Sequence, residues 1–339
     1  MEAVPQGSSV AVTGAGGFIG KHVLQALLER GYRPVAILRP SARLTPELDR
    51  VVVRHADVTN LRALAEATEG ADAIIHLAGL VSTSARDRGD LIRVNVAGAK
   101  NALQVTRRGG VKRLVFMSTT SAVGALQENT PELALNENSP FNIDETGVDY
   151  ITAKRVAHKL ALSDRAAGLP VTVLSPSFVV GPGDSLRNST QLIDLVARGQ
   201  LPVVPHGGIN PIDVRDVANA VVATLGHHDP AEHYILAGRQ NINLSKFVEQ
   251  VASVTGASAP RWRLPFALTL AAARAAETIF PHTGVTASAV RLSRYYWYFD
   301  NCRACRDLGL APRPFGQSIV DTLNWLVSGR HAGSSSRAA

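Results

Sequence analysis

The sequence has little cysteine, and this excludes most structural metal sites. Only two of its 339 residues are cysteines, Cys302 and Cys305. One C-x-x-C pair without a second pair or nearby histidines cannot complete a four-ligand zinc site. The pair lies outside any thioredoxin-like pattern. We therefore expect two incidental cysteines near the start of a C-terminal helix, and no metal site.

The sequence also lacks a long hydrophobic run and a block of basic residues. No apolar stretch is long enough to span a bilayer, and residues 1–9 show neither the charged nor the apolar part of a secretory signal. We therefore expect a cytoplasmic protein without membrane contact, although the alanine-rich segment 266–279 could touch a membrane surface. The net charge is +7, but lysine and arginine are scattered and no nucleic-acid-binding motif is present. A basic surface of this kind suits an anionic small ligand such as a nucleotide.

The most informative motif lies near the start of the chain. A short apolar run, Val10-Ala11-Val12, leads into Thr13-Gly14-Ala15-Gly16-Gly17-Phe18-Ile19-Gly20, and a helical pattern follows. A strand, a glycine-rich turn and a helix in this order form a dinucleotide pocket. Gly14 permits the tight turn, Gly17 lets the backbone approach a pyrophosphate, and Gly20 lets the helix pack close to the strand. The free N–H groups of the helix N-terminus attract the phosphates. The alternative is a plain glycine-rich turn in another α/β protein.

Short apolar runs alternate with helical patterns through the first half of the chain. Such alternation indicates a parallel sheet with helices on both faces. We predict an α/β fold of the doubly wound Rossmann type with a smaller C-terminal substrate lobe. The predicted strands are 10–13, 35–39, 51–55, 73–78, 113–118, 171–175 and 234–237. The predicted helices are 20–30, 61–68, 90–107, 150–167, 190–198, 213–225, 244–256 and 264–279.

The same reading divides the chain into two interlocked units. We expect residues 1–175, together with about 211–238, to form the dinucleotide-binding core. Residues 176–210 and 239–328 then form the substrate lobe. The last segment, 329–339, is small and polar, and we expect a disordered tail there.

Tyr150 and Lys154 form a second informative pattern. Positions i and i+4 of a helix share one face, and an ammonium group near a phenol favours the phenolate and lowers the pKa of the tyrosine. A tyrosine with a pKa near the working pH can pass a proton to or from a carbonyl oxygen. The alternative is an ordinary Tyr–Lys pair on a solvated helix.

Hydroxyl side chains follow the predicted strand 113–118, in the run Ser118-Thr119-Thr120-Ser121. A doubly wound fold places its ligands at this edge of the sheet. A hydroxyl there could donate a hydrogen bond to a substrate oxygen. The alternative is a plain transition from strand to loop.

By the order and spacing of its motifs, the chain resembles the extended short-chain dehydrogenase/reductase superfamily, in its epimerase/dehydratase-like branch. The resemblance covers residues 8–328. Its motifs are the glycine-rich turn at 13–20, Asp57-Val58, His76-Leu77-Ala78-Gly79, Asn95-Val96-x-Gly98, Ser118-Thr119-Thr120, Tyr150-x-x-x-Lys154, Ser175-Pro176, Gly181-Pro182-Gly183-Asp184 and Asp213-Val214-Arg215-Asp216-Val217-Ala218.

The resemblance implies roles for individual residues. Tyr150 would be the acid/base, and Lys154 would hold the nicotinamide ribose and depress the pKa of Tyr150. Thr120 would bind the substrate oxygen, with Ser121 as a fallback. The implied catalytic residues are Thr120, Tyr150 and Lys154. The expected cofactor-binding residues are Gly14, Gly16, Gly17, Phe18, Ile19, Gly20, Arg39, Asp57, Val58, Leu77, Ala78, Gly79, Asn95, Ser118, Tyr150, Lys154, Ser175 and Ser177.

The second predicted strand ends in Arg39-Pro40-Ser41, with no acidic residue before Glu47. An NAD-type pocket usually has an acid there to bind the ribose 2′-hydroxyl, whereas an arginine suits the 2′-phosphate of NADP. Arg43 is a possible second cation. We predict a preference for NADPH, and NAD is the alternative cofactor. A further alternative is that Arg39 is a plain surface arginine that binds no ligand.

The resemblance favours reduction of a ketone or aldehyde, with an apolar or ring compound as the expected substrate. The chain is similar to dihydroflavonol-reductase-like and 3β-hydroxysteroid-dehydrogenase-like members. Ser121-Ala122 after Thr120 speaks against a sugar-nucleotide dehydratase. An NAD-dependent hydroxysteroid-type dehydrogenase, a sugar-nucleotide epimerase and a non-catalytic NADP-binding sensor remain alternatives. Relatives often dimerise through the helices that hold Asn95 and Tyr150, so we expect a homodimer. The aromatic run 295–299 and Trp262 could line an apolar pocket.

Overall fold

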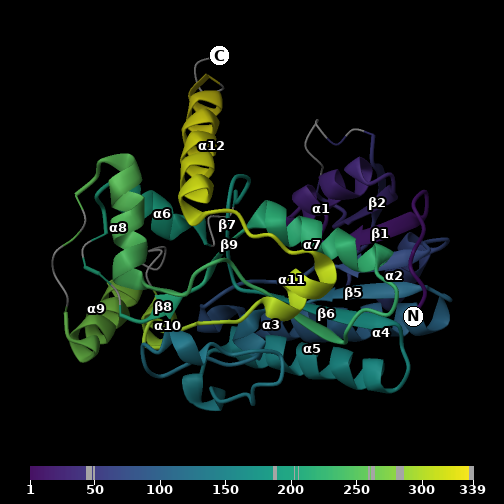
Figure 1. Ribbon diagram of the computed structural model, residues 1–339, viewed down its shortest axis with the longest axis horizontal. Coiled ribbons are helices and arrows are strands. Elements are labelled where there is room, and N and C mark those ends of the chain that lie inside the picture. The colour runs from purple at the N-terminus through teal and green to yellow at the C-terminus, as the bar shows by residue number, and fades with distance from the viewer. Residues whose placement is uncertain are drawn as a thin grey trace.

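The computed structural model describes residues 1–42, 48, 50–185, 189–201, 203–204, 206–258, 260, 264–279 and 286–335. Its centre is a sheet of seven parallel strands in the order β10-β6-β5-β4-β1-β2-β3 (Figure 1). The strands are β1 Ser9–Thr13, β2 Arg33–Leu38, β3 Val52–His55, β4 Ala73–His76, β5 Arg113–Met117, β6 Val171–Pro176 and β10 His233–Leu236. The predicted doubly wound fold is confirmed.

Helices cover both faces of this sheet. The first face carries α1 (Phe18–Glu29) and α7 (Val214–Gly226), and the second carries α2 (Leu61–Thr68), α4 (Gly98–Arg108) and α5 (Asp149–Ala166) (Figure 1). Val10 and Val12 of β1 pack into the apolar core on the first face, and Ala11 packs into the core on the second. Burial on both faces explains why the strands read as continuous apolar runs.

The order of the strands reverses at the centre of the sheet. β1 pairs with β2 on one side and with β4 on the other. The chain therefore runs outward to β3 and then returns to place β4 beside β1. In sheets of this kind ligands bind at the carboxyl ends of the strands, in the crevice at the reversal. The ends of β1, β4, β5 and β6 thus define the place of a candidate site.

The segment predicted as a single helix over 90–107 has three parts in the structure. They are α3 (Arg88–Leu91), a π-helical turn over Ile92–Ala97, and α4. Asn95 lies in the π-helical turn, and its buried side chain reaches the loop after β4. A π-helical turn adds one residue to the hydrogen-bonded ring. The spacing of apolar residues predicts a helix in this segment, but it does not predict the π-helical turn within it.

The remaining elements form a smaller lobe. Its helices are α6 (Thr190–Ala197), α8 (Leu244–Thr255), α9 (Phe266–Ile279), α10 (Ala287–Leu292) and α12 (Phe315–Ser335). Short strands pair as β7 (Phe178–Val180) with β9 (Pro211–Asp213) and β8 (Gly208–Ile209) with β11 (Ile242–Asn243). Ile193, Phe247 and Ile319 join α6, α8 and α12 in one apolar core. Figure 1 shows these helices on the side of the sheet away from β3.

Two expectations concern the C-terminal part. Cys302 and Cys305 are unbridged, and they lie at the start of α11 (Cys302–Leu308), as predicted. Helix α12 continues to Ser335. The disordered tail expected over 329–339 remains a prediction, and residues 336–339 lie outside the described residues.

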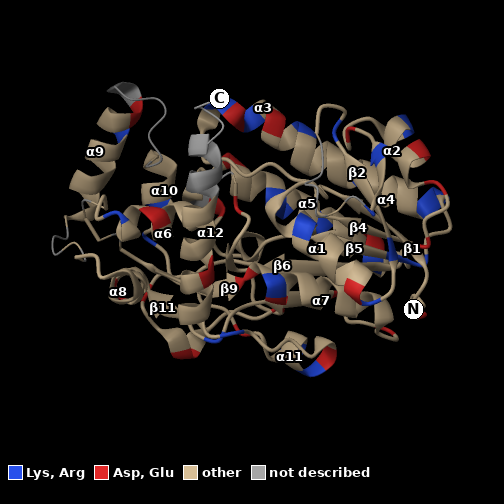
Figure 2. Ribbon diagram, turned by 90° about the horizontal axis from the view of Figure 1, so that it is seen from above, with Lys and Arg blue, Asp and Glu red and all other residues tan. Residues whose placement is uncertain are grey.

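The described part of the chain carries its charges in a dispersed way. Figure 2 shows lysine and arginine interspersed with acidic residues over both parts of the molecule. No helix in the described ranges combines the length and the apolar character that crossing a membrane requires. The same ranges contain no group of three or more His, Cys, Asp or Glu side chains arranged to hold a metal ion.

A buried ion-pair network joins the core to α12. The carboxylate of Asp213, 2% exposed, accepts hydrogen bonds from Arg215 at 2.8 to 2.9 Å and from the hydroxyl of Ser318 at 2.7 Å. Arg215 also donates to Asp321 at 2.6 Å. Burial raises the pKa of the Asp213 carboxyl, but these hydrogen bonds outweigh burial and the net shift is downward. Asp213 therefore links the helix that covers the sheet with the last helix of the lobe.

We predict that Asp213→Asn destabilises the fold more than Asp321→Asn. Removing one partner of a buried pair costs about 3 to 5 kcal/mol, and because Arg215 is 29% exposed we expect a loss near the lower end. Asp321 is 30% exposed, so its substitution should cost about 1 kcal/mol or less. Urea unfolding followed by circular dichroism measures both values. Equal losses in the two variants would contradict the central place given to Asp213.

Candidate active site

The glycine-rich turn after β1 forms a cradle with little room for side chains. Gly14 has a left-handed backbone with φ of +69°, and a Cβ there would lie 2.7 Å from the backbone nitrogen of Ala78. A Cβ on Gly20 would lie 2.7 Å from the carbonyl oxygen of Ala15, so only glycine allows α1 to start this close to β1. Gly17 precedes α1 without a side-chain cap, which leaves the first N–H groups of the helix free for an anion. This cradle fits the pyrophosphate of a dinucleotide.

The loop after β4 is fixed against this turn by buried polar groups. Thr13 Oγ1 accepts a hydrogen bond from the backbone of Ala78 at 3.3 Å and is bonded to His76 Nδ1 at 2.9 Å. The ring of His76 stacks on Phe116 of β5, with centroids 5.5 Å apart. Leu77, Ala78 and the following glycine are thereby held at the edge of the crevice, where the sequence predicts the ribose.

Asn95 supports the same loop from the π-helical turn. Its Oδ1 accepts a hydrogen bond from the backbone of Leu80 at 2.8 Å, and its Nδ2 donates to the carbonyl of Leu80 at 2.9 Å. A Cβ on Gly79 would lie 3.0 Å from Asn95 Oδ1. The amide of Asn95 is therefore engaged with protein backbone, and its expected place beside the cofactor remains a prediction.

The far end of the cradle carries Asp57 and Arg39. Asp57 accepts hydrogen bonds from the backbone of Thr59 at 2.9 Å and from its hydroxyl at 2.7 Å. These bonds, together with the positive charges of Arg93 and Arg39, lower the pKa of the Asp57 carboxyl. Arg39 is exposed and directly follows β2, and its expected contact with a 2′-phosphate remains a prediction. Arg43, the possible second cation, lies outside the described residues.

Tyr150 and Lys154 lie in the first two turns of α5, where Lys154 is buried and Tyr150 is partly buried. Lys154 Nζ donates to the carbonyl of Met117 at 2.9 Å, and burial lowers the pKa of Lys154 to about 8. Burial raises the pKa of Tyr150 to about 12, and a hydrogen bond with Thr119 acts in the opposite direction. The expected lowering of the tyrosine pKa by Lys154 is absent because the ammonium group is directed at the end of β5 and burial dominates.

The hydroxyl that lowers the pKa of Tyr150 comes from Thr119, which the sequence analysis did not select. Thr119 is partly exposed, and its Oγ1 caps a 3₁₀ turn over Thr120–Ala122 by accepting a hydrogen bond from the backbone of Ser121 at 3.3 Å. Thr120 is 4% exposed. The sequence signal for Thr119 was the run of hydroxyl residues itself, which does not tell which member turns toward the helix.

Ser118, Ser175 and Ser177 all engage side chains of the protein. Ser118 Oγ bonds to His158 Nδ1 at 2.9 Å and Ser175 Oγ bonds to His233 Nε2 at 2.8 Å. Ser177 Oγ donates to an asparagine of the loop before β9 at 3.1 Å. Their expected contacts with a cofactor remain predictions.

An apolar wall flanks Tyr150 on the side of the lobe. Phe141, Leu292, Tyr295 and Trp297 pack with Tyr150 around a small buried cluster. Trp297 Nε1 donates to the carbonyl of Leu292 at 3.1 Å, which fixes the indole. Part of the aromatic run 295–299 thus packs against the same cluster as Tyr150, whereas Trp262 lies outside the described residues.

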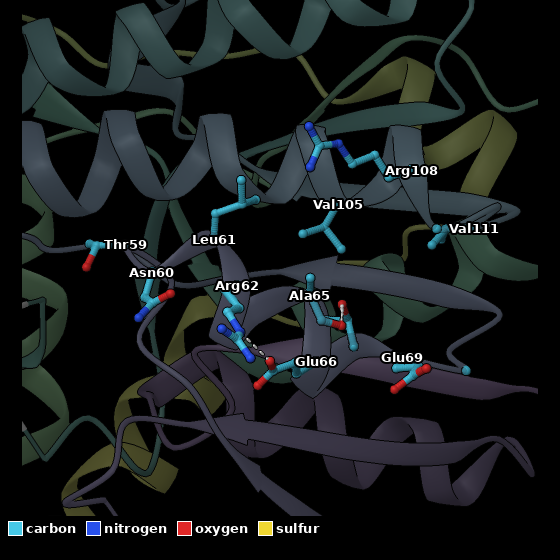
Figure 3. Close-up of a pocket in the computed structure, with 13 residues that line it drawn as sticks. Thr59, Asn60, Leu61, Arg62, Ala65, Glu66, Glu69, Val105, Arg108 and Val111 are labelled. Carbon is cyan, nitrogen blue, oxygen red and sulfur yellow. Dashed lines mark hydrogen bonds and ion pairs between the residues drawn. The ribbon is translucent and has the colours of Figure 1, made fainter.

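A separate groove of about 960 Å³ lies between α2 and α4 on the outside of the core (Figure 3). Leu61, Ala65 and Val105 form its apolar part, and an ion pair between Arg62 and Glu66 borders it. None of the predicted catalytic or cofactor-binding residues lines this groove. It is therefore not the candidate site, which lies at the strand ends.

A comparison against known families agrees with the fold, with the glycine cradle and with the pairing of Tyr150 and Lys154. Residues 10–237 match the model of the NAD dependent epimerase/dehydratase family. The chain belongs to this family. The predicted resemblance is thereby confirmed, and the protein is an enzyme that uses a nicotinamide cofactor on a hydroxyl or carbonyl group of a small molecule. The family includes both oxidoreductases and epimerases.

Individual relatives match over nearly the whole chain. A protein from Synechocystis sp. that carries the name of a dihydroflavonol 4-reductase is 28% identical over 93% of this chain and 93% of its own length. Sterol demethylase protein B from Methylococcus capsulatus is 30% identical over 93% of this chain and 97% of its own length. The crystal structure of gox2253 superimposes with a TM-score of 0.82 at 27% identity, covering 95% and 98% of the two chains.

We predict that the protein loses stability as the pH falls from 6.5 toward 5. Burial lowers the pKa of His76 to about 3 and that of His158 to about 4, and it also lowers the pKa of His233. The unfolded chain takes up protons near pH 6.5 while the folded protein does not. The stabilisation is therefore fully present above pH 6.5 and decreases by about 1.4 kcal/mol per pH unit for each histidine below it.

Urea unfolding at pH values from 7.5 to 5 measures this slope. His158→Phe removes one titrating group. The free energy of unfolding should then change less steeply with pH, by about 1.4 kcal/mol per pH unit. A free energy of unfolding that stays constant from pH 6.5 to 5 would show that the histidines are accessible to protons in the folded state.

Proposed function

We propose that this protein is an NADPH-dependent reductase that converts a ketone or aldehyde with a large apolar part into an alcohol. The observation that carries the proposal is the setting of Tyr150. Burial raises the pKa of its phenol, Thr119 is the hydroxyl that acts on that pKa, and Tyr150 packs against the same apolar cluster as Tyr295 and Trp297. A carbonyl group beside Tyr150 would meet a proton donor on one side and apolar surface on the other.

Tyr150, Thr119 and Lys154 would each have a separate role in the reduction. A reduced nicotinamide cofactor, with its pyrophosphate held by the glycine cradle, would supply a hydride to the carbonyl carbon. Tyr150 donates its phenolic proton to the oxygen as negative charge develops there, and the Thr119 hydroxyl donates a hydrogen bond to the same oxygen. Lys154, with a pKa of about 8, is mostly charged at neutral pH, and its proposed role is to hold the nicotinamide ribose.

Thr119 and Thr120 are competing candidates for the second hydroxyl. The resemblance points to Thr120, with Ser121 as a fallback. The contact with the phenol of Tyr150 favours Thr119, because one substrate oxygen must receive both hydrogen bonds and the two donors must therefore lie close together.

The apolar wall supports a substrate with a large hydrophobic portion. An aromatic side chain excludes water from its surface and offers a flat face to rings. The name of one relative, sterol demethylase protein B, mentions a compound class of this kind. We propose a ring ketone or a ketone with a long hydrocarbon part as the substrate, rather than a sugar nucleotide.

Arg39 supports the preference for NADPH. It directly follows β2 and is exposed. Its positive charge contributes to lowering the pKa of Asp57, which follows the next strand. A guanidinium group in this place can bond a 2′-phosphate through two N–H groups. The glycine cradle and Asp57 would hold the rest of the nucleotide.

We predict that Tyr150→Phe lowers kcat by about 100- to 10,000-fold, the range for loss of a general acid, and leaves NADPH binding intact. The assay follows NADPH consumption with a panel of ring ketones, long-chain ketones and aldehydes, and binding is measured by calorimetry. Conversion of a sugar nucleotide without net NADPH consumption would instead favour the epimerase alternative. Cofactor binding without turnover of any compound would favour a sensor.

The hydroxyl is identified with three conservative variants in the same assay. Thr119→Val should lower kcat by about 100-fold, as expected for loss of one donor to a developing oxyanion, while Thr120→Val and Ser121→Ala change it little. A large loss in Thr120→Val alone would return the role to Thr120.

We predict that Arg39→Ala lowers kcat/KM for NADPH by about 10- to 100-fold, because a hydrogen bond to a charged group contributes about 1.5 to 3 kcal/mol. The value for NADH should change by less than about threefold. Arg33→Ala, at the opposite end of the same strand and bonded to the carbonyl of Gly7, is the matched control. A wild-type enzyme with equal kcat/KM for both cofactors would overturn the assignment.

A further inference from the structure

Two buried histidines lie behind the strand ends that carry the candidate site. His158 is on α5, one turn after Lys154 and two turns after Tyr150, so the three side chains lie along one stripe of the helix that faces the sheet. His158 Nδ1 is bonded to Ser118 Oγ at 2.9 Å, and both side chains are nearly inaccessible to solvent. Ser118 immediately precedes Thr119.

The second histidine continues this contact toward the neighbouring strand. His233 of β10 lies edge-on to His158, with ring centroids 4.8 Å apart and planes at 79°. Its Nε2 is bonded at 2.8 Å to the hydroxyl of Ser175, near the end of β6. The four side chains thus connect β5, α5, β10 and β6 directly behind Tyr150.

Part of the contact between α5 and the sheet is apolar. Ala157 and Ala161 pack against the strands and are almost completely buried, and Leu160 and Leu162 pack against the same core. Apolar contact has no direction, whereas a hydrogen bond sets the position of one element against another. Lys154 bonds to the carbonyl of Met117, Arg155 to the carbonyl of Ala122 at 2.8 Å, and His158 to Ser118. Of these bonds, the one between His158 and Ser118 joins two buried side chains.

We propose that His158 is a positioning residue: its bond to Ser118 sets the position of α5 along β5 so that the phenol of Tyr150 meets the hydroxyl of Thr119. This inference rests on the proposed function of Tyr150. His233 supports it by closing the space around the ring of His158 and by holding the end of β6. Two groups that must act on one oxygen lose much of their effect when they are displaced by about 1 Å.

Paired variants test the proposal. His158→Phe keeps a ring of similar size against His233 but cannot bond to Ser118, and Ser118→Ala removes the other partner. Each should lower kcat by about 10- to 100-fold, with the Kd for NADPH changed by less than about threefold. The double variant should be no worse than either single variant, because both remove the same bond. His158→Asn, whose amide replaces the bonding nitrogen, should recover part of the loss.

The matched control is Thr172→Val, which alters a buried hydroxyl on β6 that has no hydrogen-bond partner. It should leave kcat unchanged. If His158→Phe and Ser118→Ala lower only the unfolding temperature and kcat stays at the wild-type value, the bond is merely structural and the proposal is wrong.

A readout without a substrate separates this proposal from the proposed function. The ionisation of Tyr150 is followed by ultraviolet difference spectroscopy, with each protein compared with the same protein carrying Tyr150→Phe. The hydrogen bond with Thr119 lowers the pKa of Tyr150, which is about 12 in the structure. The pKa should therefore rise further in His158→Phe and Ser118→Ala, where that bond is lost, and should not move in Thr172→Val. An unmoved pKa overturns the positioning role even if the enzyme reduces carbonyl compounds. A moved pKa supports it even if no compound in the panel is reduced.

Discussion

The direct backbone contact between the turn after β1 and the loop after β4 is the constraint on which the rest of the site depends. Gly14 lies so close to Leu77 and Ala78 that a single Cβ would force the two segments apart. Because β1 and β4 are neighbours at the reversal of the strand order, this contact fixes the width of the crevice. Asn95 secures the same loop from the helical side. The cradle is thus rigid before any ligand enters, which reduces the entropy lost on binding.

Burial gives Tyr150 and Lys154 opposite but compatible properties. The same apolar surroundings raise the pKa of the phenol and lower that of the ammonium group, since each disfavours its charged form. At neutral pH the phenol still holds its proton and the ammonium group is still charged. This combination suits donation of a proton to a carbonyl oxygen, which is the reductive direction. Abstraction of a proton from an alcohol would require a lower tyrosine pKa or a higher pH.

Local patterns in the sequence predicted the fold and the positions of the main motifs. The glycine turn and the positions of the strands depend on turn chemistry and periodicity, which neighbouring residues determine. Thr119 could not be chosen over Thr120 in this way, because the choice depends on which hydroxyl α5 approaches. The bond between Ser175 and His233 joins residues 58 positions apart, so it exists only after β10 has joined the sheet. The raised pKa of Tyr150 was missed for a related reason: a Tyr–Lys spacing shows the neighbour but not the depth of burial.

The division of the proposed site between two parts of the chain explains why its chemistry is easier to infer than its substrate. Tyr150 and Lys154 lie on α5 and Thr119 follows β5, whereas Leu292, Tyr295 and Trp297 come from the C-terminal part and pack against the same small apolar cluster as Tyr150. Substitutions in that wall would change the apolar surface offered to a substrate without changing the proposed proton donor. The bond between His158 and Ser118 joins α5 to the end of β5, so the proposed positioning of Tyr150 does not depend on which substrate the wall admits.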